Sequence, residues 1–145
     1  MIRIAMLSKW HVHAAGYASQ IQKTEDAAIT CVWDDDAARG QAWAKELSVD
    51  FEPNLDRLLA RKDVDAVVVD TPTSDHARVM VAAARAGKHI FTEKAMAPTL
   101  AECRQISAAI AENQVKFCIS FPNLTTSLAQ FARKASIRIT FPVAT

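Results

Sequence analysis

The chain has 145 residues, half of them hydrophobic, which is enough for one compact domain with a buried core. Its 17 basic and 16 acidic residues nearly balance, which argues against a nucleic-acid partner held by bulk electrostatics. No apolar stretch approaches the roughly 18 to 20 residues of a membrane span. The N-terminus is too short for a signal-peptide core, so we expect a cytoplasmic protein without a membrane partner.

Strand-like and helix-like segments alternate along the chain. Short apolar runs predict strands at residues 2–7, 28–33, 49–51, 64–70, 88–92 and 115–121. Helical spacing and capping signals predict helices at residues 12–22, 36–47, 55–61, 75–86, 99–113 and 124–135. This alternation indicates a doubly wound, Rossmann-like α/β fold with a parallel sheet. Ligands of such folds bind beyond the carboxyl ends of the strands, so functional residues should follow Leu7, Trp33, Asp70, Thr92 and Phe121.

The segment after the first strand, residues 8–16, occupies the place of the glycine-rich phosphate loop of dinucleotide-binding folds. The chain has only 3 glycines, and none precedes Gly16, so the G-x-G-x-x-G fingerprint is missing. A phosphate here would have to bind the Ser8 hydroxyl and free backbone N–H groups near His11 to His13. The simpler interpretation is a plain turn from strand to helix.

His11 and His13 form a His-x-His pair, a pattern that can hold a divalent metal in amidohydrolase barrels. Such a site needs further ligands at later strand ends, and among the histidines only His76 and His89 remain. The chain is also too short for an eight-stranded barrel of about 250 residues. We therefore expect no metal, and a His-x-His metal-dependent hydrolase is the most distant alternative.

Acidic residues follow the second strand. Asp34 lies 21 residues after His13, and an acid about 20 residues past the phosphate loop holds the ribose hydroxyls in NAD-binding folds. Asp35 would repel a ribose 2′-phosphate, and no arginine follows directly, so NAD is favoured over NADP. Asp36 is suited to cap the next helix. In the simplest interpretation, all three aspartates only cap and charge that helix.

Two later strand ends also carry polar residues. After the strand at 64–70, Thr73 or Ser74 can cap the following helix. After the strand at 88–92 comes the pair Glu93–Lys94. A lysine at the carboxyl end of a strand can hydrogen-bond a substrate hydroxyl and help to move its proton.

Together these segments resemble the N-terminal NAD(P)-binding domain of the Gfo/Idh/MocA family of oxidoreductases, over residues 1–121. The most specific part is residues 86–102, AGKHIFTEKAMAPTLAE, which is similar to the family's A-G-K-H-V-x-x-E-K-P stretch. Residues 71–76 resemble its T-P-x-x-x-H turn, and residues 34–39 resemble its ribose-binding D-x-D turn. One departure is that Ala95, and not proline, follows the lysine.

The resemblance implies hydride transfer between NAD and a hydroxyl-bearing carbon of a sugar, polyol or related ring. It implies that Lys94 contacts substrate and nicotinamide, that Glu93 orients this lysine, and that Asp34 binds the ribose. The other implied cofactor-binding residues line the pyrophosphate turn, the ribose or the nicotinamide half, and they are Ser8, Trp10, His11, Val12, Asp35, Thr71, Pro72, Thr73 and His76.

Family members are about twice as long or more, and their second domain carries the substrate pocket and a catalytic histidine and aspartate. We expect that domain to be absent here, because residues 122–145 do not resemble the family's continuation and instead suggest a helix and a strand-like tail at 137–141. The small-molecule substrate then belongs to a longer parent protein, and this chain alone is expected to be inactive. The alternative is a non-catalytic Rossmann module for weak nucleotide binding or assembly. An uncovered apolar surface predicts a homo-oligomer.

Overall fold

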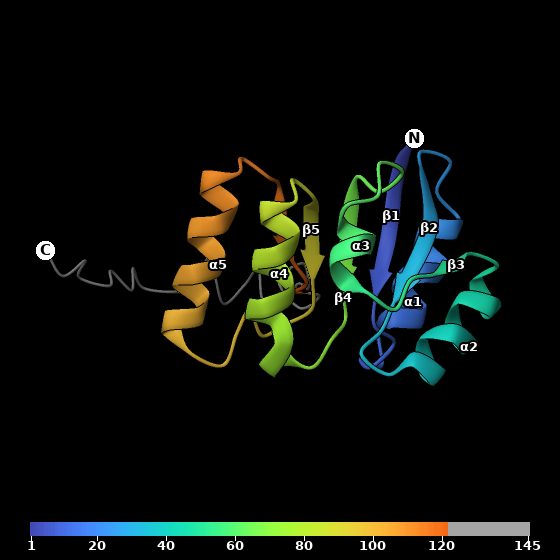
Figure 1. Ribbon diagram of the computed structural model, residues 1–145, viewed down its shortest axis with the longest axis horizontal. Helices are drawn as coiled ribbons and strands as arrows, with labels where there is room; N and C mark the ends of the chain where they lie inside the picture. The colour runs from blue at the N-terminus through green and yellow to red at the C-terminus, as the bar shows by residue number, and fades with distance from the viewer. Residues whose placement is uncertain (122–145) are drawn as a thin grey trace, which may run out of the picture.

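The computed structural model describes residues 1–121, which form a six-stranded sheet flanked by helices (Figure 1). All neighbouring strands are parallel. Their spatial order is β3-β2-β1-β4-β5-β6, the order of a dinucleotide-binding Rossmann fold. The strand bounds are Ile2–Leu7, Ala27–Trp33, Asp50–Phe51, Ala66–Val69, His89–Thr92 and Phe117–Ile119. The predicted doubly wound α/β fold is therefore confirmed.

Helices connect the strands and cover both faces of the sheet. Helices α1 and α2 pack on one face, and α3, α4 and α5 pack on the other, where α4 and α5 lie side by side (Figure 1). The predicted helix at 124–135 and the strand-like stretch at 137–141 lie outside the described residues. The helix bounds are Ala14–Gln22, Ala37–Leu47, Leu55–Leu59, His76–Arg85 and Leu100–Glu112, with a 3-10 turn, η1, at Thr73–Asp75.

The core consists of two layers that share the central strands. Along β1, Ala5 and Leu7 point into the layer beneath α3, α4 and α5, and Met6 points into the layer beneath α1 and α2. Successive side chains of a strand face opposite sides. A central strand that is covered on both faces is therefore largely apolar, as β4 is throughout and β1 is from Ile4 to Leu7.

Two of the predicted helix starts are confirmed in detail. The Asp36 side chain accepts a hydrogen bond from the Arg39 N–H at 3.0 Å and caps α2. Thr99 and Glu102 form a complete capping box at the start of α5. Both caps satisfy backbone donors that the first helical turn leaves without partners.

Two other helix starts differ from the predictions. Neither Thr73 nor Ser74 caps α4, because both belong to η1 and the first residues of α4 receive no side-chain cap. Pro72, which is extended, leads directly into this tighter turn. Helix α1 begins at Ala14, two residues later than predicted, because the backbone before it makes a separate hydrogen-bonded turn between Ala14 N–H and the His11 carbonyl.

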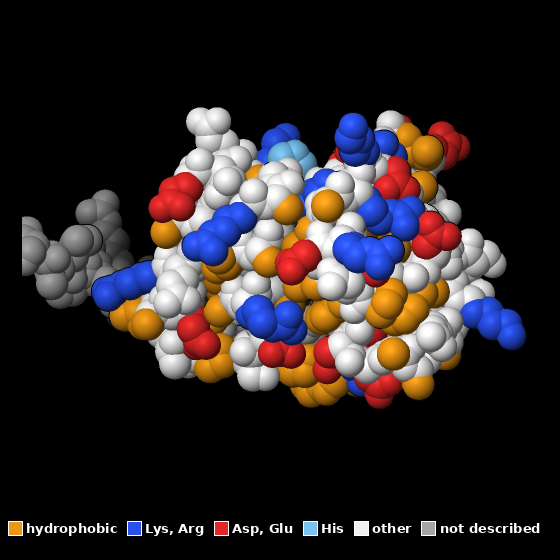
Figure 2. Space-filling model, viewed as in Figure 1, with side chains coloured by type: hydrophobic (Ala, Val, Ile, Leu, Met, Phe, Trp, Pro, Cys, Tyr) orange, Lys and Arg blue, Asp and Glu red, His pale blue; other side chains and the backbone are white. Residues whose placement is uncertain are grey.

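The surface carries charges of both signs. On the face shown in Figure 2, lysine and arginine side chains alternate with aspartate and glutamate, and no single-sign region dominates that view. None of the helices within residues 1–121 combines the length and apolar character needed to cross a bilayer.

Candidate functional site

The site lies where the order of the strands reverses. The chain leaves β1 and β4, which are neighbours in the sheet, toward opposite faces. The loops beyond their carboxyl ends begin with Ser8 and Asp70, and Glu93 follows the next strand, β5. A crevice at such a switch point is where ligands of open α/β sheets bind.

Ser8 takes the backbone conformation that the missing fingerprint glycine would supply. Its φ is +75°, in the left-handed region that side chains rarely adopt. The residue is completely buried, and its hydroxyl accepts a hydrogen bond from the Trp10 N–H at 3.1 Å. The tight turn of a phosphate loop is therefore present without a glycine, and the Ser8 side chain lies inside the turn.

The amides of this loop are mostly occupied by the protein itself. The Lys9 N–H donates to Asp34 at 2.9 Å, the His11 N–H donates to the Asp70 carbonyl at 3.1 Å, and the His13 N–H donates to His11 Nδ1 at 3.2 Å. The prediction of free donors near His11 to His13 is therefore wrong for both histidines. Within residues 8–13, the amide of Val12 alone has no acceptor in the part of the chain that the structure describes.

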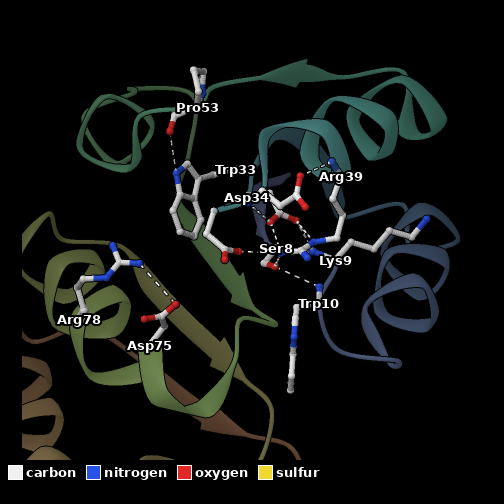
Figure 3. Close-up of polar contacts among 11 residues, drawn as sticks. Ser8, Lys9, Trp10, Trp33, Asp34, Arg39, Pro53, Asp75 and Arg78 are labelled. Carbon is white, nitrogen blue, oxygen red and sulfur yellow. Dashed lines mark hydrogen bonds and ion pairs between the residues drawn. The ribbon is translucent and has the colours of Figure 1, made fainter.

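Asp34 lies at the end of β2 and is neutralised by Arg39 from the first turns of α2 (Figure 3). The Asp34 side chain is buried, and its two oxygens lie 2.5 Å from Arg39 Nη2 and 3.0 Å from Arg39 Nε. The same carboxylate accepts hydrogen bonds from the amides of Lys9 and Asp36. Burial alone would raise the pKa of Asp34, but these donors bring it below its ordinary value.

The sequence interpretation did not select Arg39, because this residue lies five positions after Asp34 and not directly after it. One helical turn brings its guanidinium back onto Asp34 and, at 2.8 Å, onto Asp35. Burial and the neighbouring Asp34 raise the pKa of Asp35, which is exposed and keeps one carboxylate oxygen without a partner among residues 1–121. Asp35 is therefore the more accessible of the two predicted ribose ligands.

The T-P-x-x-x-H turn is held by His76. Its imidazole is buried, with Nδ1 2.9 Å from the Ala95 carbonyl oxygen and Nε2 3.2 Å from the Thr71 carbonyl oxygen. The ring therefore connects the loop after β4 to the loop after β5. Pro72 and Thr73 are partly exposed at the same strand ends.

Asp70 is a buried carboxylic acid without a partner. It is fully buried, and neither oxygen has a hydrogen-bond partner within residues 1–121; the Thr71 hydroxyl is buried without a partner too. Burial, and then the charge of Glu93, raise the pKa of Asp70 to about 7. The sequence interpretation passed over this residue as the last residue of a strand. The sequence pattern that could have pointed to Asp70 is an acidic residue directly after the apolar residues of β4.

Glu93 is almost completely buried and bonds mainly to α1 and the loop before it. Its Oε1 lies 2.6 Å from His13 Nδ1 and accepts a hydrogen bond from the Tyr17 hydroxyl, and its Oε2 accepts the Lys94 N–H at 3.0 Å. Burial alone would raise the pKa of Glu93, but these hydrogen bonds lower it. The carboxylate thus contacts the backbone of Lys94 and not its ammonium.

Lys94 projects from the carboxyl end of β5. Its side chain is exposed and makes no hydrogen bond or ion pair with the described residues, and its peptide bond to Ala95 is cis. Tyr17 and Ser120, which the sequence interpretation did not select, lie beside Glu93, with their hydroxyls 2.8 Å apart. A hollow of about 440 Å³ opens there, lined by Val12, His13, Gly16, Tyr17, Gln20 and Ser120. A larger one, of about 720 Å³, lies on α4 and α5 and contains none of these groups.

A family model described as an oxidoreductase family with an NAD-binding Rossmann fold, GFO_IDH_MocA, matches residues 11–121. The chain belongs to the Gfo/Idh/MocA family. These residues form its NAD(P)-binding Rossmann domain, and the resemblance found in the sequence is confirmed.

The relatives within the Gfo/Idh/MocA family have names that refer to different reactions. An uncharacterized oxidoreductase of Streptococcus pneumoniae is 37% identical over 114 residues, 75% of this chain and 30% of the relative. A 2,7-anhydro-N-acetylneuraminate hydratase of Mediterraneibacter gnavus is 36% identical over 67% of this chain and 25% of the relative. The solved structure of a putative myo-inositol dehydrogenase from Sinorhizobium meliloti superposes with a TM-score of 0.80 at 27% identity, over 93% of this chain and 40% of that one. The chain thus spans about a quarter to two-fifths of their length.

In this Gfo/Idh/MocA domain, some parts of the site offer free hydrogen-bonding groups to a nicotinamide dinucleotide and others do not. The unpartnered Asp70 and Thr71 oxygens at the end of β4 leave hydrogen-bonding capacity for a ligand. The turn at Ser8 has the positive φ that glycine would otherwise supply, and Asp35, a predicted ribose ligand, is exposed. The loop between them offers one amide where glycine-rich loops offer several. A bound cofactor would therefore depend more on its two ends than on its pyrophosphate.

Proposed function

We propose that this chain is the cofactor-binding part of a nicotinamide-dependent oxidoreductase. The reaction is hydride transfer between NAD and a hydroxyl-bearing carbon of a sugar, polyol or related ring. The observation that carries the proposal is Lys94, an exposed lysine of the family's E-K motif at the carboxyl end of β5, in a Rossmann sheet of this family. A lysine in that position can hydrogen-bond the reacting hydroxyl and share its proton.

The remaining predicted residues keep their proposed places along the cofactor. Ser8, Trp10, His11 and Val12 border the pyrophosphate, and Asp34 and Asp35 face the adenosine ribose. Thr71, Pro72, Thr73, His76 and Glu93 lie toward the nicotinamide. For Asp34 the role is indirect, because Arg39 and two amides already occupy both of its oxygens.

NAD is the proposed cofactor in preference to NADP. At the end of β2, the carboxylates of Asp34 and Asp35 contact the single guanidinium of Arg39, and the Asp36 carboxylate accepts a hydrogen bond from the Arg39 backbone N–H. A 2′-phosphate placed there would meet more negative than positive charge. A ribose 2′-hydroxyl would instead find the Asp35 oxygen as an acceptor.

Titration of NADH and NADPH into the 145-residue chain, followed by cofactor fluorescence, tests this assignment. We expect NADH to bind more tightly, and Asp35→Asn to narrow the difference because it removes one repelling charge. Asp26→Asn, at an exposed turn, is the matched control and should change neither affinity. Tighter NADPH binding would refute the ribose assignment, and no binding of either cofactor would favour the non-catalytic module.

Turnover is to be tested in a protein that also carries a substrate-binding part, since this chain spans only 25–40% of the relatives described above. There Lys94→Ala should lower kcat by about 10²-fold or more, the usual range of acid–base contributions. NAD affinity should be nearly unchanged, because the ribose and pyrophosphate contacts lie elsewhere. A variant with unchanged kcat would remove Lys94 from the mechanism.

We further propose a small-molecule substrate, a homo-oligomeric state and a location in the cytoplasm, with neither a nucleic-acid nor a membrane partner. The near-neutral charge and the mixed charge pattern of Figure 2 support the absence of a nucleic-acid partner.

A further inference from the structure

Three side chains with metal-binding atoms meet at the mouth of the site. One ligand atom from each of His11, His13 and Glu93 lies within 4.8 Å of the other two. The two histidines come from the loop after β1, and Glu93 comes from the end of β5, 80 residues after His13. The sequence interpretation set a metal aside because only His76 and His89 remained as further histidines and because the chain is too short for an eight-stranded barrel, and it did not consider Glu93 as the third ligand.

We propose that His11, His13 and Glu93 bind one divalent transition-metal ion. The site shares His11 and Glu93 with the nicotinamide function proposed above, but its test needs no nucleotide. Two imidazoles and one carboxylate form a ligand set used by catalytic zinc and by non-haem iron(II) sites.

Glu93 is the fixed member of the set. The Tyr17 hydroxyl and the Lys94 amide hold its carboxylate, and its side chain is 1% exposed. Hydrogen bonds of this kind orient ligating carboxylates in metal sites. Tyr17 is itself held by Ser120 and by an edge-on contact with Phe91.

The two histidines are more exposed than Glu93 and give an ion access to the site. The His13 side chain is 46% exposed, and its ring packs edge-on against His11 with ring centres 4.7 Å apart. Zinc bonds of about 2.0–2.1 Å in a tetrahedral site require ligand atoms about 3.3 Å apart. The ligand atoms of the three residues lie within 4.8 Å of one another, with His13 Nδ1 2.6 Å from Glu93 Oε1, so their separations bracket that spacing.

The charge around the cluster also favours a cation. Asp70 is buried without a partner and close enough for its charge to act on both Glu93 and Tyr17. The opposing charges that reach His11 come from Lys94, which is exposed and extends into solvent, and from His13 and His76 when protonated. An ion at the cluster would offset the charge of the buried Glu93 carboxylate.

The ligand set leaves room for a further group on the ion. All four histidines and three cysteines of the chain lie within residues 1–121, and residues 122–145 contain no histidine, cysteine, aspartate or glutamate. Three protein ligands leave at least one position of a four-coordinate ion open. An oxygen ligand suits this open position, either from water or from a hydroxyl or carboxylate group of a substrate.

Titration of Co²⁺ and Zn²⁺ into the chelator-treated 145-residue chain tests the site, with visible absorption for Co²⁺ and calorimetry for Zn²⁺. We expect one ion per chain, a visible Co²⁺ spectrum of low-symmetry nitrogen and oxygen coordination, and a Tm that rises with ion concentration. His13→Asn and Glu93→Gln should each weaken ion binding at least about tenfold. Loss of a residue that only orients a metal ligand already weakens binding by about that factor, so loss of a ligand itself should weaken it at least as much.

His89→Asn is the matched control, because His89 is exposed at the opposite, amino end of β5. It should bind the ions as the unaltered chain does. Circular dichroism verifies folding, and His13→Asn remains decisive if Glu93→Gln is unstable, because the His13 side chain is largely exposed. The proposal fails if the folded chain binds no ion, if His13→Asn binds as tightly as the unaltered chain, or if a thiolate-to-cobalt band assigns the ion to Cys103 or Cys118.

Discussion

At the scale of single residues, the site concentrates groups that depart from their usual environments. Ser8 adopts a glycine-like backbone conformation, and Asp70 lies buried without a partner. Buried polar groups normally have hydrogen-bond partners, and exceptions call for an explanation. Both residues lie at the switch point of the sheet, where ligands of such folds bind. Part of the backbone strain and of the desolvation cost within residues 1–121 therefore lies at the candidate site.

Asp70→Asn should change how stability depends on pH. The pKa of Asp70 is raised from 3.8 to about 7, so between these values the folded chain holds a proton that the unfolded chain has lost. Stability therefore falls as pH rises from about 4 to 7, and the full penalty applies above 7. The variant should flatten this fall and raise the free energy of unfolding at pH 8 by about 1–3 kcal/mol.

Urea unfolding of both proteins from pH 4 to 8, in EDTA, measures this difference. Asp26→Asn, at an exposed position, should leave the pH profile unchanged. Parallel profiles for the Asp70→Asn variant and the unaltered chain would mean that Asp70 is solvated or paired in solution.

At the scale of elements, the close packing of α2 on the sheet positions the Asp34–Arg39 pair. Gly40 allows this approach, because a Cβ at that position would lie 2.3 Å from the Phe51 ring and 2.7 Å from the Asp34 Cβ. Trp43, one turn further along α2, is fully buried beside it. The position of Arg39 relative to the end of β2 thus depends on a residue without a side chain.

Gly40→Ala and Gly16→Ala should have opposite effects, although both glycines lie inside helices. The methyl group at 40 would push α2 away from β2 and β3, at a cost of about 1–3 kcal/mol. The methyl group at 16 would meet nothing within 4 Å and should stabilise α1 by about 0.5–1 kcal/mol. Thermal unfolding of the two variants measures both effects. A stabilised Gly40→Ala variant would contradict the packing described here.

At the scale of the whole molecule, one side of the sheet is less covered than the other. Within residues 1–121, helices α1 and α2 contact mainly β2 and β3, whereas no helix of that layer lies over β6. A shallow hollow of about 200 Å³ over β4, β5 and β6 is lined largely by apolar residues, among them Val68, Phe91 and Cys118. Such surfaces tend to be covered by another surface.

We expect the chain to form a homo-oligomer through this surface. Cys118 is exposed on β6, which pairs only with β5 among the described strands, so Cys118→Lys adds a charge there without filling the core. Light scattering should show an oligomer for the unaltered chain and a smaller species for this variant. Gln105→Lys, on the far side in α5, should leave the mass unchanged. A monomeric unaltered chain would refute the proposed oligomer.

The sequence by itself determined the alternation of strands and helices, the parallel sheet, the capped starts of α2 and α5, and the family, because these depend on local periodicity and contiguous motifs. It could not determine which side chains meet across the sheet. Only the tertiary structure brought Arg39 onto Asp34, left Asp70 without a partner, and placed Glu93 against His13 and Tyr17. Contacts between residues up to 80 positions apart depend on strand order and register, which bring separate loops to one edge and which no local pattern encodes.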